Sequence, residues 1–410
     1  MPSQGTRTGA AAAVVLLLGG CALLSGCQLL SELGDDGVYD SPLTADDRRP
    51  PGPSFLQYPI WRKGEQSAPL MHTAAGTREV RGSSAWWTRD GDLVTGDYDV
   101  LRLFGADRAD GEDAQIRVPG LNPDQLGVTG EAISALQFDD ALTIDVFSPD
   151  LADHRTIEVP ASALDTDQAS GGSSDAELQL HGDPFTLDGV TWVEWGVNSE
   201  DDTLTDHGLL RIEGDEVDGV LRNQPIVRLY PAYDGSALLL LRQDNGEDED
   251  CGGCVVEQDL VELDPDTGEV AAEYGMPPGY QRDWRVDAVD KVGDTVAVRF
   301  RVYEGEDESG HAEWQLWTYD GEWTEQEALA GVRVWYQDGG RLVESAFDPE
   351  GAGNTSAGEY PATLTWVPGE TGDISGGEVV AEPSKETCQL GGREQFCGQM
   401  VTTGSLLPRE

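Results

Sequence analysis

Basic residues are scarce in this chain of 410 residues. Aspartate and glutamate number 77, lysine and arginine together number 26, and the formal net charge is −51. The only lysines are Lys63, Lys291 and Lys385. Such a surface repels nucleic acid and anionic lipid headgroups, so neither is expected as a ligand. It would attract a cation or a basic partner.

Long apolar runs are absent after residue 27, where no stretch reaches the ~18–20 apolar residues that a membrane-spanning helix needs. The first 27 residues differ, because an apolar run from Ala10 to Leu18 follows Arg7 and leads into small residues. This is the pattern of an export signal. Its end, Leu24-Ser25-Gly26-Cys27, resembles the lipobox of bacterial lipoproteins. The resemblance implies cleavage before Cys27, a diacylglycerol on its thiol, and anchoring on the extracytoplasmic side of the cell membrane.

Other interpretations of this segment remain open. Leu18-Gly19-Gly20-Cys21 is a second candidate box, although it would leave a short apolar core. A plain secretory signal and an uncleaved anchor are the further alternatives. The predicted organisation is a signal peptide at 1–26, lipidated Cys27 with a disordered acidic, proline-rich tether at 27–54, and a folded domain at 55–410. The lysine-poor composition, rich in Ala, Gly and Asp, resembles that of proteins from actinobacteria or from salt-adapted organisms.

Cysteine is rare, and two of the six cysteines, Cys21 and Cys27, lie within the first 27 residues. The other four are Cys251, Cys254, Cys388 and Cys397. In an oxidising compartment this even number predicts two disulfides, with 251–254 and 388–397 as the local pairing among three possible connectivities. Redox catalysis at Cys251 and Cys254 is disfavoured by the acidic run before them, since negative charge raises the pKa of a thiol. A zinc site is disfavoured because the two pairs lie far apart in the sequence.

Helical periodicity is also missing from residues 55–410, where strand-like runs alternate with Asp-Gly, Gly-Gly and Pro turns. Six runs rich in Leu, Ile, Trp and Tyr recur at intervals of 42 to 66 residues. They are Leu101–Phe104, Thr143–Val146, Leu209–Ile212, Leu260–Leu263, Leu316–Tyr319 and Leu364–Val367. This rhythm predicts an all-β fold, a β-propeller. Residues 55–80 and 375–410 would form a seventh blade that closes the ring. Six blades, eight blades and two β-sandwich domains are the alternatives.

One segment carries a local signature of such repeats. Asp259 to Val270 reads as a strand, Leu-Asp-x-x-Thr-Gly-Glu, and a second strand. It resembles the turn of PQQ-type and related WD-like propeller repeats, with Pro265 presetting φ and Gly268 permitting a positive φ. Such repeats imply the fold and not a quinone cofactor. Thr186 to Trp192 resembles the Asp-box of sialidase-like propellers but is one residue short, so an ordinary Asp-Gly hairpin is favoured.

Catalytic signatures are absent. The five histidines lie in no metal-binding spacing, and no nucleophile elbow or phosphate-binding glycine loop occurs. We therefore assign no catalytic residue and predict no cofactor. Acidic clusters offer oxygen ligands for a structural calcium ion, but in so acidic a chain they are expected to be solvated loops. These clusters are Asp97 with Asp99, Glu247–Asp250, Asp264 with Asp266, and Glu304 with Glu306–Glu308.

The eleven tryptophans are expected mainly to pack between blades. Trp86, Trp87, Trp192 and Trp195 have polar neighbours, which predicts that some of them lie near the surface. Together these features favour a membrane-anchored, non-enzymatic binding or scaffold module for an extracytoplasmic protein or a cell-wall component. The alternatives are a glycan-active or quinone-dependent enzyme, which predicts a polar cluster in the central funnel, and a calcium- or small-ligand-binding lipoprotein.

Overall fold

All the described residues belong to one compact unit, Ser41–Glu410. The computed structural model describes residues 52–57, 61–62, 65–66, 69–81, 84–88, 91–97, 99–106, 114–137, 143–160, 177–198, 204–214, 216–222, 226–232, 236–244, 257–281, 284–303, 312–346, 362–370, 374–381, 387–390, 393–396, 400–402 and 404–408. Within these residues no helix is long and apolar enough to cross a bilayer. The sequence predicts strands, and strands account for nearly all of the regular structure in the described residues.

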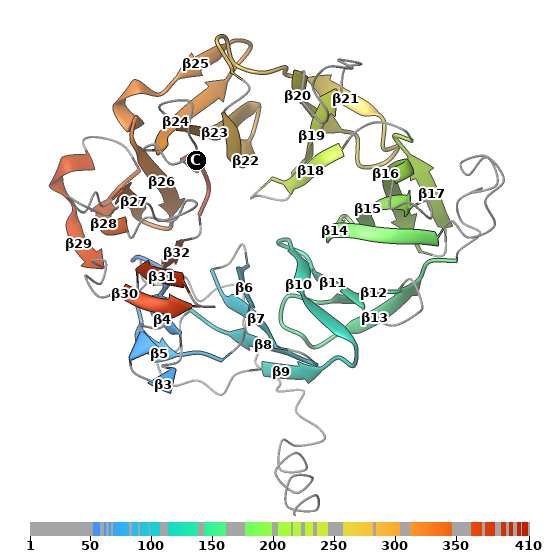
Figure 1. Ribbon diagram of the computed structural model, residues 1–410, viewed down its shortest axis with the longest axis horizontal. Coiled ribbons are helices and arrows are strands. Elements are labelled where there is room, and N and C mark those ends of the chain that lie inside the picture. The colour runs from blue at the N-terminus through green and yellow to red at the C-terminus, as the bar shows by residue number, and fades with distance from the viewer. Residues whose placement is uncertain are drawn as a thin grey trace, which may run out of the picture. The chain divides into compact units, whose positions relative to one another are not determined.

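Seven antiparallel sheets of four strands each form the blades of a ring (Figure 1). The fold is therefore a seven-bladed β-propeller, and the six-blade, eight-blade and two-sandwich alternatives are wrong. Blade 1 contains, from the inside outward, β32 (Met400–Thr402), β1 (Phe55–Gln57), β4 (Leu70–Thr73) and β5 (Gly76–Glu79). In the other six blades the first strand in sequence is the innermost, as Figure 1 shows.

The strands of blades 2 to 7 follow one another along the chain. Blade 2 is β6 (Ser84–Trp87), β7 (Leu93–Asp97), β8 (Val100–Phe104) and β9 (Ala114–Arg117); blade 3 is β10 (Leu121–Val128), β11 (Ile133–Gln137), β12 (Thr143–Phe147) and β13 (His154–Glu158). Blade 4 is β14 (Glu177–Leu187), β15 (Val190–Asn198), β16 (Leu204–Glu213) and β17 (Glu216–Val220); blade 5 is β18 (Ile226–Pro231), β19 (Leu238–Asp244), β20 (Glu257–Leu263) and β21 (Val270–Glu273). Blade 6 is β22 (Arg285–Val292), β23 (Thr295–Tyr303), β24 (Ala312–Tyr319) and β25 (Trp323–Glu325); blade 7 is β26 (Val332–Gln337), β27 (Gly340–Ala346), β28 (Ala362–Pro368) and β29 (Glu378–Ala381).

The six recurring runs of the sequence occupy equivalent places in the ring. Each is the third strand of its blade, in β8, β12, β16, β20, β24 and β28 of blades 2 to 7. Each third strand contributes buried apolar residues to the packing, which makes the repeat visible in the sequence; examples are Leu101, Ile144, Leu209, Leu260, Leu316 and Leu364. The two segments left over, at the start and end of the domain, do combine into blade 1.

The ring closes where β32 pairs antiparallel with β1, matching Phe55 with Thr402. The chain then continues past β32 to the innermost strands of blades 7 and 6. Ser405 and Tyr336 of β26 exchange two backbone hydrogen bonds, of 2.8 and 3.0 Å. The Asp290 carboxylate on β22 accepts hydrogen bonds from Ser405 Oγ at 2.5 Å and from the Leu406 N–H at 2.8 Å. The C-terminal tail thus ties three blades together.

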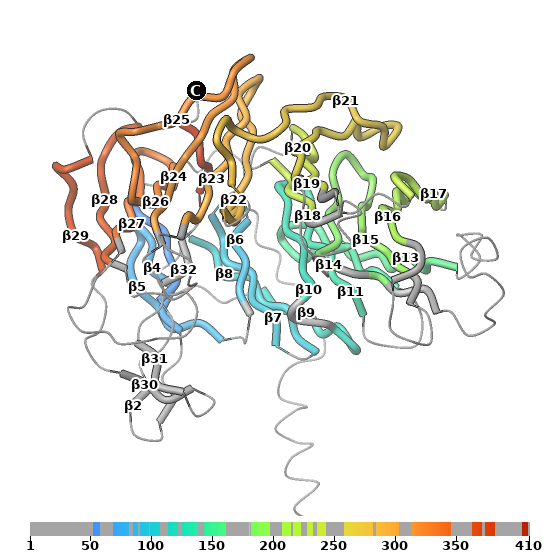
Figure 2. The backbone as a smooth tube through the Cα atoms, turned by 45° about the horizontal axis from the view of Figure 1, so that its top comes forward, coloured from blue at the N-terminus to red at the C-terminus, as the bar shows by residue number. Residues whose placement is uncertain are grey.

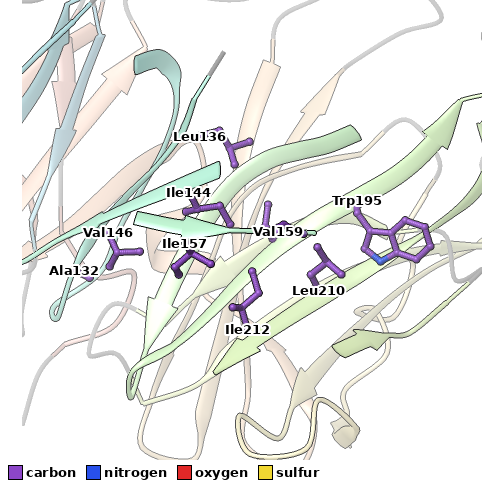
Figure 3. Packing of buried hydrophobic residues seen from close by; sticks show 10 residues of the cluster. Ala132, Leu136, Ile144, Val146, Ile157, Val159, Trp195, Leu210 and Ile212 are labelled. Atoms are coloured by element: carbon purple, nitrogen blue, oxygen red, sulfur yellow. The ribbon is translucent and has the colours of Figure 1, made fainter. Parts of the chain in front are cut away.

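Apolar side chains from facing sheets fill the spaces between blades. Figure 3 shows one such layer, in which Ile144 and Ile157 of blade 3 meet Trp195 and Leu210 of blade 4. Of the four tryptophans with polar neighbours, Trp86 and Trp87 are partly exposed, in agreement with the prediction that some lie near the surface, whereas Trp192 and Trp195 are 0% and 2% exposed. The two lie on β15, a second strand buried on both faces, so polar neighbours there do not indicate exposure.

Two hairpins and two short 3-10 helices do not belong to any of the seven blades. The hairpins β2 (Trp61–Arg62) with β3 (Glu65–Gln66) and β30 (Thr387–Leu390) with β31 (Arg393–Phe396) lie outside the blades, as do the short 3-10 helices η2 (Glu327–Leu329) and η3 (Ile374–Gly376). The predicted turn between β20 and β21 is confirmed. Its Asp264 carboxylate accepts the N–H groups of Asp266 at 2.8 Å and Thr267 at 3.0 Å, and Gly268 has a φ of +71°.

Candidate functional site

β-Bulges interrupt the innermost strands of four consecutive blades. The pairing register shifts in β10, β14, β18 and β22, which are neighbours around the ring (Figure 2). The position of each shift can be given by counting residues along the second strand of the blade. In blades 3 and 4 the shift lies opposite the fourth residue of that strand. In blade 5 it lies between the fourth and fifth residues, and in blade 6 between the fifth and sixth. The described parts of β6, β26 and β32 pair without a shift. Because bulges redirect side chains and cluster at binding sites, this side of the ring is the candidate site.

The bulge in β14 presents two carboxyl groups. In β14 the residues Gly182, Asp183 and Pro184 oppose a single residue of β15, and Glu194 lies next to them on β15. Gly182 has a φ of +68°, and a Cβ atom there would lie 3.3 Å from the Glu194 carboxyl carbon. Glycine at 182 therefore permits the turn of the bulge and leaves the carboxyl uncovered on that side. The carboxylate in turn accepts a hydrogen bond from the Leu229 N–H on β18, in blade 5.

Both carboxyl groups are held in a poorly hydrated place. Burial raises the pKa of Glu194 from 4.5 to about 7, and the charge of Asp183 adds to this, while the Leu229 hydrogen bond and Arg228 oppose it. Burial likewise raises the pKa of Asp183 against the opposing charge of Arg228. Desolvation thus exceeds the compensation that this chain supplies.

Two residues of β18 complete this group. The Arg228 guanidinium carbon lies 5.6 Å from the centre of the Tyr230 ring, and the Arg228 side chain is exposed. Burial raises the pKa of Tyr230 to about 12; Arg228 opposes this, and the charges of Asp287 and Glu194 reinforce it. The Tyr230 hydroxyl therefore stays protonated and lies within electrostatic reach of carboxylates on both neighbouring blades. We call Asp183, Glu194, Arg228 and Tyr230 the inner-strand group.

A buried ion network borders this group between blades 6 and 7. Asp287, the bulged residue of β22, accepts hydrogen bonds from Arg299 Nε at 2.7 Å and from an Arg333 Nη at 3.0 Å. Arg333 also donates to Glu344 at 3.0 Å, and the Arg299 guanidinium lies 3.9 Å from the centre of the Trp335 ring. Burial alone would raise the pKa of Asp287, but the charges of Arg299 and Arg333 outweigh it and hold that pKa low. These side chains bond mainly to one another, so the network joins the two blades.

The raised pKa of Glu194 predicts a pH-dependent stability difference. Between pH 4.5 and 7 the folded protein keeps a proton on Glu194 that the unfolded chain releases. The stabilisation of the folded state by this proton is therefore complete below pH 4.5 and is lost as the pH rises through 7. The shift corresponds to roughly 3 kcal/mol. We expect Glu194→Gln to match the wild type at pH 5 and to be more stable by up to about that amount at pH 8. Urea unfolding at both pH values measures it.

Glu216→Gln is the matched control for this experiment. Glu216 is an exposed carboxylate on β17 of the same blade. Its replacement should give the same small stability change at pH 5 and at pH 8. An equal difference between wild type and Glu194→Gln at the two pH values would contradict the assigned environment of Glu194.

The site residues predicted from the sequence lie elsewhere or outside the described part. Cys27, Cys251, Cys254 and Cys397 are outside the described residues; Cys388 lies on β30, where its side chain is not described. Lipidation and both disulfides stay predictions.

The acidic clusters proposed as calcium ligands have other roles where the structure describes them. Asp97 pairs with Arg102 at 3.9 Å, and Asp99 pairs with Arg117 at 3.5 Å. Asp264 and Asp266 form the turn already described, and both glutamate-rich clusters lie outside the described residues. Within the described ranges no three His, Cys, Asp or Glu side chains group as metal ligands would.

The inner-strand group was not predicted. Glu194 is one acid among 77, and neither composition nor spacing distinguishes it. One local signal was present, because Pro184 and Gly182 lie within a strand, where proline and glycine mark a bulge or an edge. The contact between β15 and β18 depends on blade packing and has no counterpart in the sequence pattern.

The chain was compared with protein-family models, curated protein sequences and solved structures. No protein-family model and no curated protein sequence matches the chain. Solved structures do match. The β-propeller domain of the Trilobed protease from Pyrococcus furiosus has 11% identity and a TM-score of 0.36, with 77% of this chain and 78% of that chain covered. The Pyrococcus horikoshii acylaminoacyl peptidase has 13% identity and a TM-score of 0.44, with 84% of this chain covering 57% of its length. Apo AztD from Citrobacter koseri has 9% identity and a TM-score of 0.40, with 86% and 99% covered. At these identities and TM-scores the matches say nothing about what this chain does.

Proposed function

We propose that this chain is a lipid-anchored, extracytoplasmic β-propeller that binds a basic partner at the bulged inner strands of its ring. The observation that carries the proposal is the half-buried carboxyl pair of Asp183 and Glu194, whose desolvation Arg228 offsets only in part. The net charge of −51 supports it, because such a surface attracts basic partners from a distance. The signal and the box ending at Cys27 support the location.

In the proposed complex, the negative surface charge attracts the basic partner from a distance, and the carboxyl pair of Asp183 and Glu194 then contacts it directly. Long-range attraction by surface charge is screened by salt, with a Debye length of about 8 Å at physiological ionic strength. A contact with the partly buried pair is screened less. We therefore infer a complex whose association rate falls with salt, while the contribution of Glu194 to affinity persists.

One observation favours a second candidate function. A pKa of about 7 also suits a group that exchanges protons during catalysis, and Glu194 has that value on an innermost strand of the ring. This supports an extracytoplasmic glycan-active enzyme as the alternative. Turnover of a cell-wall glycan that Glu194→Gln abolishes would favour the enzyme over the binding module.

The location is tested by replacing the proposed lipid acceptor. Cys27→Ala is expected to prevent acylation and release most of the protein from the membrane fraction. Cys21→Ala, which removes the alternative box, should leave membrane attachment unchanged. Fractionation with mass spectrometry of the mature N-terminus measures both. Release by Cys21→Ala but not by Cys27→Ala would place the anchor at the other cysteine, and membrane attachment of both variants would contradict lipid anchoring.

A further inference from the structure

We propose that His72 makes the closure of the ring sensitive to acid, because protonation of its imidazole loosens β1 from β4. Blade 1 is built from both ends of the domain, in the strand order β32, β1, β4 and β5. We call the pairing of β32 with β1 and of β1 with β4 the closing seam. The inference concerns how the ring is held closed, so it does not depend on the proposed function.

β1 is the short central strand of the closing seam. It has three residues and pairs over all three with β32 on one side and with β4 on the other. Phe55 lies opposite Thr402 of β32 and opposite His72 of β4. Phe55 also packs against Leu342 of blade 7. With so few backbone pairs, the side-chain contacts of β1 help to decide whether the seam stays closed.

The His72 side chain contacts two of the three residues of β1. Its ring stacks on Phe55, with the ring centres 4.4 Å apart and an angle of 11° between the planes. Nε2 lies 3.3 Å from Oε1 of Gln57, and Nδ1 lies 3.0 Å from Oγ1 of Thr77 on β5. An uncharged imidazole suits both partners, because one of its nitrogens donates and the other accepts. His72 therefore joins β1 to β4 and β5.

A second histidine with the same stacking has a different partner. In blade 3, His154 stacks on Phe147 with the ring centres 4.6 Å apart and the planes at 8°. Its Nε2 lies 2.9 Å from the carboxylate of Asp145, whose side chain is 1% exposed. A proton on His154 would gain an ion pair, whereas the partners of His72 within the described residues are an amide and a hydroxyl. Because the attraction of a cation to a phenyl ring is common to both stacks, the hydrogen-bonding partners distinguish them.

Charged side chains on the strands around His72 have other surroundings. On β5, Glu79 is exposed, and Arg78 donates to the Gly105 carbonyl of blade 2 at 2.7 Å. The charged residues on β27 and β29 of blade 7 are Glu344, which bonds to Arg333, Arg341 on the opposite face of β27 from Leu342, and exposed Glu378. Burial lowers the pKa of His72. The closed seam therefore favours the uncharged imidazole.

The sign of the pH effect follows from this lowered pKa. Above pH 6.5, the ordinary value, His72 is uncharged whether the seam is closed or open, and the seam keeps its full stability. As the pH falls, the hydrated imidazole of the open seam takes up a proton before that of the closed seam, so acid favours opening. The stability is lost progressively down to the lowered pKa of the closed state. β32 and the tail that follows it then lose their partner strand.

The test is hydrogen exchange of the full-length protein, measured by mass spectrometry at pH 7.5 and 5.5 and corrected for the intrinsic exchange rate. Peptides that cover residues 52–57 and 400–407 report on the closing seam. In the wild type their corrected exchange should rise by about twofold to tenfold at pH 5.5, where tenfold is the limit for a group of pKa 6.5 that stays uncharged in the closed seam. His72→Phe keeps an aromatic ring beside Phe55 and cannot titrate, so its corrected exchange should be equal at the two pH values.

Two further variants serve as controls. His154→Gln keeps a donor for Asp145 and removes the other stacked histidine, so the rise at the closing seam should persist. His72→Gln is a second variant that cannot titrate, and it should lack the rise even if it exchanges faster than the wild type at both pH values. Peptides from residues 257–263 in blade 5 give an internal reference that should not change.

The outcomes separate His72 from the other groups that titrate in this range. A rise at the closing seam in the wild type and in His154→Gln, absent from both His72 variants, supports the proposal. A rise that both His72 variants retain assigns the acid sensitivity to another group and overturns it. Equal corrected exchange of the wild type at the two pH values overturns it as well. Neither result bears on the proposed binding of a basic partner.

Discussion

Asp287→Ala is expected to destabilise the protein by about 3–5 kcal/mol, the range for breaking a buried ion pair by removing one partner. The side chain of Arg299 is 1% exposed, and Asp287 is its carboxylate partner. Arg333 would keep Glu344, while Arg299 would keep its hydrogen bond to the Val334 carbonyl, its contact with the Trp335 ring and the more distant attraction of Glu344. The loss leaves two arginines with Glu344 as their shared carboxylate, and so a buried positive charge that is compensated only in part, between blades 6 and 7. Chemical denaturation measures the change.

A double variant separates charge from packing in this prediction. Asp287→Ala with Arg299→Met removes both charges and keeps an apolar side chain over Trp335, so it should recover much of the lost stability. Asp99→Ala, which breaks an exposed pair with Arg117, should cost less than about 1 kcal/mol. A double variant as unstable as Asp287→Ala alone would contradict this account of the network.

Removal of residues 400–410 is expected to abolish cooperative folding of the ring. This deletion takes away β32, the innermost strand of blade 1, together with Ser405 and its hydrogen bonds to Tyr336 and Asp290. It also removes Leu406 and Leu407, which are 2% and 7% exposed between blades 6 and 7. Each fully buried leucine contributes about 1.5–3 kcal/mol, so the total approaches the 5–15 kcal/mol of a typical domain.

A point variant tests the same closure without removing a strand. Leu406→Ala should destabilise the protein by about 2–5 kcal/mol while leaving β32 intact. Deletion of residues 409–410 alone should leave the thermal midpoint unchanged. Cooperative unfolding near the wild-type midpoint after deletion of 400–410 would show that the ring closes without its C-terminal tail.

The fold was largely predictable because the repeat has a physical cause. Third strands such as Leu260–Leu263 contribute buried apolar residues to the packing, so they recur with the blade spacing. The Asp264 turn was predictable because its residues determine its conformation locally. Blade 1 followed from what the six repeats left over.

The candidate site was not predictable because its residues come together through packing between repeats and not through the repeat itself. The effect of Asp183 and Glu194 depends on a bulge in β14 and on the Leu229 N–H of another blade. Asp287, Arg299 and Arg333 come together from three strands of two blades. Contacts of this kind are set by packing between repeats, which leaves no periodic pattern in the sequence. Burial of Trp192 and Trp195 was missed for the same reason.

The most direct test of the central claim is to map where a basic ligand binds. A lysine-rich peptide with a photo-reactive diazirine would be crosslinked to the full-length protein at physiological salt, and the crosslinked residues identified by mass spectrometry. We predict that crosslinks concentrate in residues 182–198 and 226–231, the segments that carry the inner-strand group, and that Glu194→Gln reduces them. Crosslinks spread evenly over the acidic outer strands of all seven blades would contradict the claim.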